Sequence, residues 1–156
     1  TKSTGSLTLN HVQPGRHLYM LATGTGLAPF MSLVRSSEAF DHFERVILVH
    51  SVRHAPALAY RDELESRHGD AFLYVPTVTR EDFPNTARGA DLFRSGELAE
   101  QLGLPAADPE QDRVMLCGNP QMNKDMSEHL EENGWTMTNY KGVGNFTVEQ
   151  AFVLQH

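Results

Sequence analysis

The sequence predicts an α/β protein with a doubly wound, mainly parallel sheet of five to six strands and helices on both faces. From residue 18 onward, short apolar runs rich in aliphatic and β-branched residues alternate with longer amphipathic segments, and this alternation is typical of a parallel sheet. The run Val46–Val52 is apolar at most positions, as expected of a strand that helices cover on both faces. A length of 156 residues suits one such domain.

The first half of the chain reads as strand, tight turn and helix, followed by two more strands with a helix between them. Pro56 is a suitable residue to start a helix and Gly69 to stop it. The expected elements are strand Leu18–Ala22, helix Pro29–Phe40, strand Val46–Val52 in the interior of the sheet, helix Pro56–Arg67 and strand Phe72–Val78.

The second half begins with a polar, proline-interrupted loop at Arg80–Arg88. Loops at the ends of parallel strands are where such folds place functional residues. The elements expected after this loop are helix Asp91–Leu102, strand Val114–Cys117, helix Asn123–Asn133 closed by Gly134, strand Trp135–Thr138, and an apolar tail Phe146–Val153 that forms a last strand or packs in a cleft.

Composition excludes several classes of protein. The net charge of −7 argues against a nucleic-acid partner, because phosphate-backbone affinity requires clustered Lys and Arg. The single cysteine, Cys117, rules out an internal disulfide and multi-cysteine metal centres. No apolar stretch approaches the roughly 20 residues of a membrane helix, and the polar start is not a secretory signal. We therefore expect a cytoplasmic protein with no membrane partner.

The eight histidines raise the question of a metal site, with His50 and His54 the best-spaced pair. These two straddle the end of a strand, and no carboxylate is spaced to complete a zinc site. We expect no metal.

The loop after the first strand has the composition of a phosphate-binding turn. Gly24 and Gly26 lie between a strand and a helix, where backbone N–H groups and the helix dipole can meet a pyrophosphate. Thr23 and Thr25 add hydroxyl donors. The dinucleotide fingerprint is only partly met, because Pro29 stands where a third glycine is usual. The alternative is that the glycines serve only the turn.

Three arginines follow the ends of neighbouring strands and could recognise a 2′-phosphate, which requires fixed cations. Arg53 ends the second strand, Arg80 follows the third, and Arg88 lies eight residues further. Thr79 could add a hydroxyl donor. The alternative for each arginine is a solvated surface charge.

Five ordered blocks, LATGTGLAPFMSLVR, VILVHSVR, PTVTRE, MLCGNPQM and AFV, resemble the NADP-binding domain of bacterial ferredoxin (flavodoxin)–NADP reductases. The resemblance implies a ferredoxin reductase-like nucleotide-binding fold over residues 18–156, with residues 1–17 as the remnant of a preceding FAD-binding β-barrel domain. It implies NADP(H) as cofactor, FAD held by that other domain, and ferredoxin or flavodoxin as partner. Because the family's flavin motif is nowhere in this sequence, the chain alone should be inactive.

The same resemblance assigns residues to the two ends of the nucleotide. Arg53, Arg80 and Arg88 correspond to the arginines that hold the 2′-phosphate. The nicotinamide and flavin end is assigned to Cys117 with the neighbouring Gly118, to Glu149, to Ala151 facing the flavin ring and to Phe152 beside it. Cys117 and Phe152 could equally be core residues, and Glu149 could lie in a surface turn. The segment KGVGNFT departs from the family's usual proline- and glutamate-containing pattern and leaves the geometry before the tail open.

Other readings remain within and outside this superfamily. The chain could be the reductase module of a flavohaemoglobin or of an oxygenase system, although the TVTRE and AFV blocks favour a ferredoxin or flavodoxin partner. It could also be a dinucleotide-sensing domain without catalysis.

Overall fold

The protein, seen here as a computed structural model that describes residues 12–150, is built on one five-stranded parallel sheet. The strand order is β3-β2-β1-β4-β5, and every neighbouring pair is parallel. The strands are β1 His17–Thr23, β2 Arg45–Val52, β3 Phe72–Val78, β4 Arg113–Gly118 and β5 Phe146–Gln150. The predicted doubly wound α/β class is confirmed.

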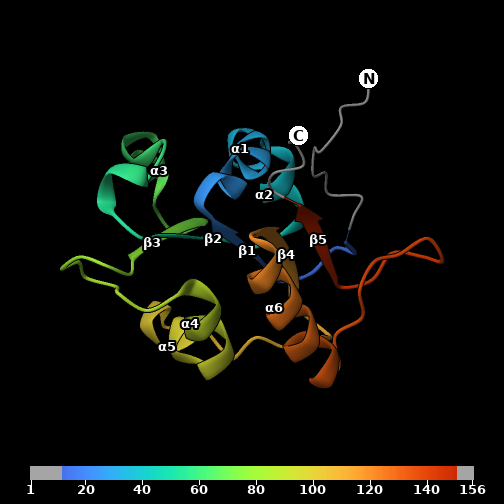
Figure 1. The fold of residues 1–156 in the computed structure, drawn as a ribbon. Helices are drawn as coiled ribbons and strands as arrows, with labels where there is room; N and C mark the ends of the chain where they lie inside the picture. The colour runs from blue at the N-terminus through green and yellow to red at the C-terminus, as the bar shows by residue number, and fades with distance from the viewer. Residues whose placement is uncertain (1–11, 151–156) are drawn as a thin grey trace.

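Helices cover the sheet in two layers, with α1, α2 and α3 on one face and α4, α5 and α6 on the other (Figure 1). The helices are η2 Gly24–Leu27, α1 Ala28–Arg35, α2 Glu38–His42, η3 Ala55–Ala57, α3 Arg61–Arg67, α4 Gly89–Ser95, α5 Glu97–Leu102 and α6 Pro120–Glu132. Within residues 12–150, no helix has the length and apolar character that crossing a membrane requires.

Alternate side chains of the central strand β1 pack into two separate cores, one on each face of the sheet. Leu18 and Met20 pack under α1 and α2, whereas Tyr19 and Leu21 pack under α4 and α6. Because both faces are covered, β1 and β4 are buried along nearly their whole length.

The edge of the sheet beyond β4 differs from the sequence prediction. The predicted fifth strand Trp135–Thr138 is wrong, because Met137 forms only an isolated bridge with Phe146. Trp135 packs into the core, with its ring 6.4 Å from that of Phe93. The place beside β4 is taken by β5, so the predicted tail is a strand up to Gln150; residues 151–153 lie outside the described part.

Three predicted helices are broken, and a fourth begins early. The first breaks at Ser36, whose backbone is extended, and the third breaks at Gly96, whose φ is 83°. The second is divided into η3 and α3, and Tyr60, directly before α3, has the left-handed conformation with a φ of 58°. Helix α6 begins at Pro120 because the Asn119 side chain caps it by accepting a hydrogen bond from the Met122 N–H.

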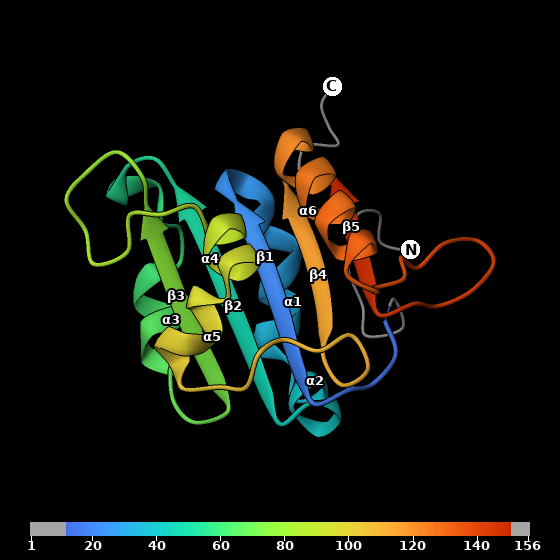
Figure 2. The same cartoon turned by 90° about the horizontal axis from the view of Figure 1, so that it is seen from below.

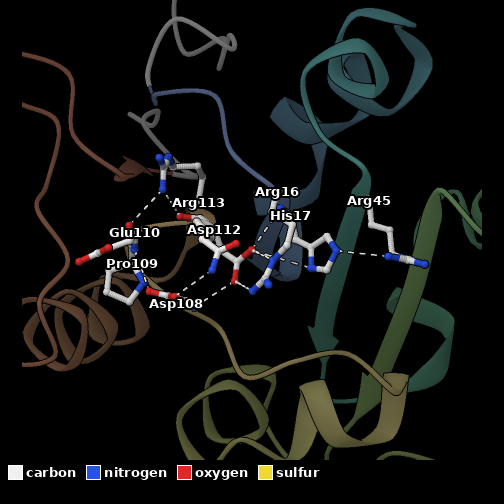
Figure 3. Close-up of polar contacts among 9 residues, drawn as sticks. Arg16, His17, Arg45, Asp108, Pro109, Glu110, Asp112 and Arg113 are labelled. Carbon is white, nitrogen blue, oxygen red and sulfur yellow. Dashed lines mark hydrogen bonds and ion pairs between the residues drawn. The ribbon is translucent and has the colours of Figure 1, made fainter.

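A buried carboxylate, Asp112, joins the amino ends of β1 and β4 (Figure 3). Its oxygens accept two hydrogen bonds from the Arg16 guanidinium, at 3.0 and 2.8 Å. They also accept from the backbone N–H groups of His17, at 3.2 Å, and Asp108, at 2.9 Å. The hydrogen bonds that Arg16 donates to the Asp112 carboxylate raise the pKa of Arg16. The sequence assigned residues 1–17 to a preceding domain, yet Arg16 is hydrogen-bonded to this sheet through Asp112. Residues 1–11 lie outside the described part of the chain, and the domain boundary after residue 17 stays a prediction.

Asp112→Ala should lower the free energy of unfolding by about 3 kcal/mol, because it leaves a partly buried guanidinium and two N–H groups without their acceptor. Urea denaturation measures this loss. Glu128→Gln is the matched control: Glu128 pairs with Lys124 in an exposed i,i+4 contact, so the urea midpoint should not move. A loss below about 1 kcal/mol for Asp112→Ala would contradict the anchoring role.

Candidate functional site

A groove of about 1180 Å³ opens at the carboxyl ends of the strands, the end that bears the arrowheads in Figure 2. The chain adds β2 and β3 on one side of β1 and then β4 and β5 on the other side, so the strand order reverses between β1 and β4. Open α/β sheets bind ligands at such a switch point. Seven of the residues predicted from the sequence line the groove: Thr23, Gly24, Thr25, Arg53, Thr79, Arg80 and Arg88.

The turn after β1 requires both of its glycines, for different reasons. Gly24 has a positive φ of 49°, a backbone conformation that residues other than glycine rarely adopt. A Cβ on Gly26 would lie 2.0 Å from the carbonyl oxygen of Cys117, so the turn can rest on β4 only if residue 26 has no side chain. Gly26 and Pro29 do not line the groove; Pro29 lies in the first turn of α1, where its fixed φ suits the helix.

A second turn, after β4, is tied to the first. The Thr23 hydroxyl oxygen accepts a hydrogen bond of 2.8 Å from the Asn119 N–H. A Cβ on Gly118 would lie 2.5 Å from that same hydroxyl oxygen, so Gly118 allows the approach without lining the groove itself. The start of α6 thereby reaches the groove through Asn119, Gln121 and Met122. Sequence reasoning missed these residues, although Asn-Pro is a recognisable helix start.

The three arginines come together from separate elements. The β2–β3 hydrogen bonding continues past the strand ends, with the Thr79 N–H bonded to the Val52 carbonyl at 2.9 Å and the Arg80 N–H bonded to the Arg53 carbonyl at 3.0 Å. Arg88 directly precedes α4. Within residues 12–150, no carboxylate pairs with any of the three. A fourth arginine of the groove, Arg94, is paired with Asp91. The groove thus holds three exposed guanidinium groups without a carboxylate partner in the described residues, in a chain whose net charge is −7.

The position of Arg88 depends on Ser51, which sequence reasoning also missed. The Ser51 hydroxyl oxygen accepts hydrogen bonds from the Gly89 N–H at 2.9 Å and from the Thr77 hydroxyl at 3.0 Å. A Cβ on Gly89 would lie 2.6 Å from the Val49 side chain. Helix α4 therefore begins pressed against β2, and this contact places Arg88 at the groove.

Cys117 and Glu149, assigned to the nicotinamide end, are direct neighbours in the β4–β5 register. Cys117 is fully buried in the core under α1 and does not line the groove. Burial, with a smaller contribution from the Glu149 carboxylate, raises the pKa of the Cys117 thiol to about 12. This thiol is therefore neutral and suited to packing rather than to nucleophilic chemistry. Ala151 and Phe152 lie outside the described residues.

The two histidines considered as metal ligands face different partners. His50 Nε2 lies 2.8 Å from the Gly24 carbonyl oxygen, and His54 Nδ1 lies 2.9 Å from the Glu81 carboxylate. In the part of the chain that the structure describes, no group of three or more His, Cys, Asp or Glu side chains converges on one point. The groove instead combines backbone N–H groups, hydroxyls and guanidinium groups, which are donors suited to phosphates.

Comparison with known proteins shows the family and the fold of this chain. The model of the family described as oxidoreductase NAD-binding domain matches residues 20–128. A ferredoxin–NADP reductase of Azotobacter vinelandii is 44% identical, over 97% of this chain and 63% of that protein. A ferredoxin NADP+ reductase structure from Neisseria gonorrhoeae, with bound FAD and NADP, is 33% identical with a TM-score of 0.87, over 96% of this chain and 61% of that one.

A flavohaemoglobin of Malassezia yamatoensis, 22% identical with a TM-score of 0.62 over 92% of this chain and 33% of that one, shares the fold alone. The resemblance drawn from the sequence blocks is confirmed, and the chain spans less than two thirds of the length of these relatives.

Gly26→Ala should destabilise the protein by roughly 1 to 3 kcal/mol, because the new methyl group overlaps the Cys117 carbonyl and forces the turn away from β4. Gly69→Ala is the control, since a Cβ at Gly69 meets no atom within 4 Å. Thermal unfolding of both variants measures the difference. Equal unfolding temperatures for Gly26→Ala and the unaltered chain would show that the turn does not rest on β4 as described.

Proposed function

Because the chain belongs to the oxidoreductase NAD-binding domain family, we propose that it is the NADP(H)-binding part of a flavin-dependent ferredoxin– or flavodoxin–NADP reductase. The observation that carries this proposal is the meeting of three arginines, which have no carboxylate partner in the part of the chain that the structure describes, in the groove that also receives the glycine turn. A 2′-phosphate bears close to two negative charges, and guanidinium forks are the side chains best suited to bind it.

The two ends of the groove suggest how the nucleotide lies. The turn at Gly24 and Thr25 and the Thr23 hydroxyl offer donors for the pyrophosphate. Arg53, Arg80 and Arg88 offer cations for the 2′-phosphate, with Thr79 beside them. These groups bind and orient the nucleotide, while the buried strands beneath them keep water from that side. When bound, the nicotinamide supplies the hydride chemistry.

We assign Cys117 and Glu149 to the nicotinamide end, as the resemblance implies. Their adjacency across β4 and β5 supports one shared place for them. Asn123 steadies this place by donating from its side-chain amide to the Gly118 carbonyl, at 3.2 Å. The neutral Cys117 thiol, which is buried and outside the groove lining, would pack behind this place. Ala151 facing the flavin ring and Phe152 beside it remain part of the proposal.

The proposal places FAD on a domain outside these 156 residues and names ferredoxin or flavodoxin as the electron-transfer partner. Support comes from the relatives: those at 44% and 33% identity are named ferredoxin–NADP reductases, and the latter was solved with bound FAD and NADP. The flavohaemoglobin alternative has support from the fold alone. We include in the proposal the cytoplasmic location that the sequence predicts.

Replacing any one of the three arginines with Ala should weaken binding of 2′,5′-ADP by about ten- to a hundredfold and leave 5′-AMP binding nearly unchanged, because one charge-assisted contact with the 2′-phosphate is lost. Isothermal calorimetry measures both ligands on Arg53→Ala, Arg80→Ala and Arg88→Ala.

Arg67→Ala is the control for this series, since Arg67 is paired with Glu63 on α3 and does not line the groove. Equal affinity of the unaltered chain for 2′,5′-ADP and 5′-AMP would defeat the assignment of NADP(H).

The purified chain should show no stoichiometric flavin absorbance and no NADPH-dependent diaphorase activity, and fusion behind a flavin-binding domain of a ferredoxin–NADP reductase should restore that activity. The reason is that the chain supplies the nucleotide site, whereas the flavin carries the electrons onward. A tightly bound flavin on the chain alone would contradict the assignment of FAD to another domain. An inactive fusion that still binds NADPH would favour a dinucleotide-sensing domain.

A further inference from the structure

We propose that His50 is a positioning residue for the phosphate-binding turn: its buried Nε2–H holds the Gly24 carbonyl inward, so that the N–H edge of the turn faces the groove. This inference rests on the proposed function, because it concerns how the same groove receives the phosphates of NADP(H). His50 is not among the residues that the sequence predicts to bind the nucleotide.

The contact between His50 and the turn has a defined direction. His50 lies near the carboxyl end of β2, with no exposed surface, and its Nε2 is 2.8 Å from the Gly24 carbonyl oxygen. A carbonyl oxygen only accepts, so Nε2 must carry the hydrogen and donate it. The other ring nitrogen, Nδ1, is buried without a hydrogen-bond partner in the described residues. Burial lowers the pKa of His50, which keeps the ring neutral with one proton to donate.

The planar peptide bond carries this contact to the groove. In a trans peptide the C=O and the following N–H point in opposite directions. Because His50 holds the Gly24 carbonyl toward the sheet, the N–H of Thr25 in the same peptide unit points the other way. Gly24 and Thr25 both line the groove, and a Cβ on Gly24 would meet no atom within 4 Å. The backbone edge of the turn is thus open to a ligand.

Packing alone does not explain a histidine at this position. Val46 and Leu48 precede it on the same face of β2 and belong to the apolar core under α1, so an aliphatic side chain would continue the pattern. Histidine instead leaves Nδ1 buried and unpaired, which is unfavourable for folding. The donor to Gly24 is the interaction that an aliphatic residue would lose.

Three variants separate positioning from packing. His50→Leu removes the donor, whereas His50→Gln retains one, because the Gln amide nitrogen lies the same four bonds from Cα as His Nε2. His50→Asn carries the same amide on a side chain one bond shorter. Calorimetry with NADP+ and with 2′-AMP reports the turn and the arginines separately, since 2′-AMP has no pyrophosphate. Urea denaturation without ligand reports folding.

We expect His50→Leu to weaken NADP+ binding about tenfold, the loss of about one hydrogen bond, with 2′-AMP binding changed less than about twofold. His50→Gln should recover most of the NADP+ affinity and His50→Asn should not. Unchanged NADP+ binding by His50→Leu would overturn the inference, and so would equal weakening of both ligands, which would indicate a general loss of fold.

If His50→Leu does not fold, the comparison of His50→Gln with His50→Asn decides, and equal NADP+ affinities for these two overturn the inference. Failure of the unaltered chain to bind NADP+ would instead defeat the proposed function, and this inference with it. The two failures are therefore distinguishable.

Discussion

The contact of Gly26 with the carbonyl oxygen of Cys117 is the constraint on which the site depends. It leaves no room for a side chain, so the turn after β1 lies directly on the end of β4. From there the hydrogen bond between Thr23 and Asn119 ties the start of α6 to the same place. Two helix starts, from the first and last parts of the domain, are thereby brought to one groove.

The buried Asp112 cluster and the three exposed arginines lie at opposite ends of the sheet. At the amino ends of the strands, Asp112 joins β1 to β4 through hydrogen bonds from Arg16 and from two backbone groups (Figure 3). At the carboxyl ends, Arg53, Arg80 and Arg88 keep their guanidinium groups free of carboxylate partners within residues 12–150. A charge that stabilises the fold is paired and buried, whereas the charges suited to an anionic ligand stay exposed.

Placement of the arginines is a property of the backbone as much as of the side chains. The β2–β3 hydrogen bonds extend beyond the strands to Thr79 and Arg80, and Ser51 docks the start of α4 on β2. These contacts bring together residues that are up to 35 positions apart in the sequence, from Arg53 to Arg88. An acidic chain can therefore present a local cationic site without a basic surface overall.

The sequence by itself determined the parallel α/β class, the glycine turn and the set of arginines, because strand periodicity, positive-φ turns and residues after strand ends are local features. Only the tertiary structure decided that Phe146–Gln150, not Trp135–Thr138, pairs with β4. Both segments begin with alternating apolar and polar residues, and local pattern does not rank two candidates for one edge. The tertiary structure also decided the partners of His50 and Asp112. Those partners, Gly24 and Arg16, are 26 and 96 residues away, and such contacts arise only when the strands have assembled.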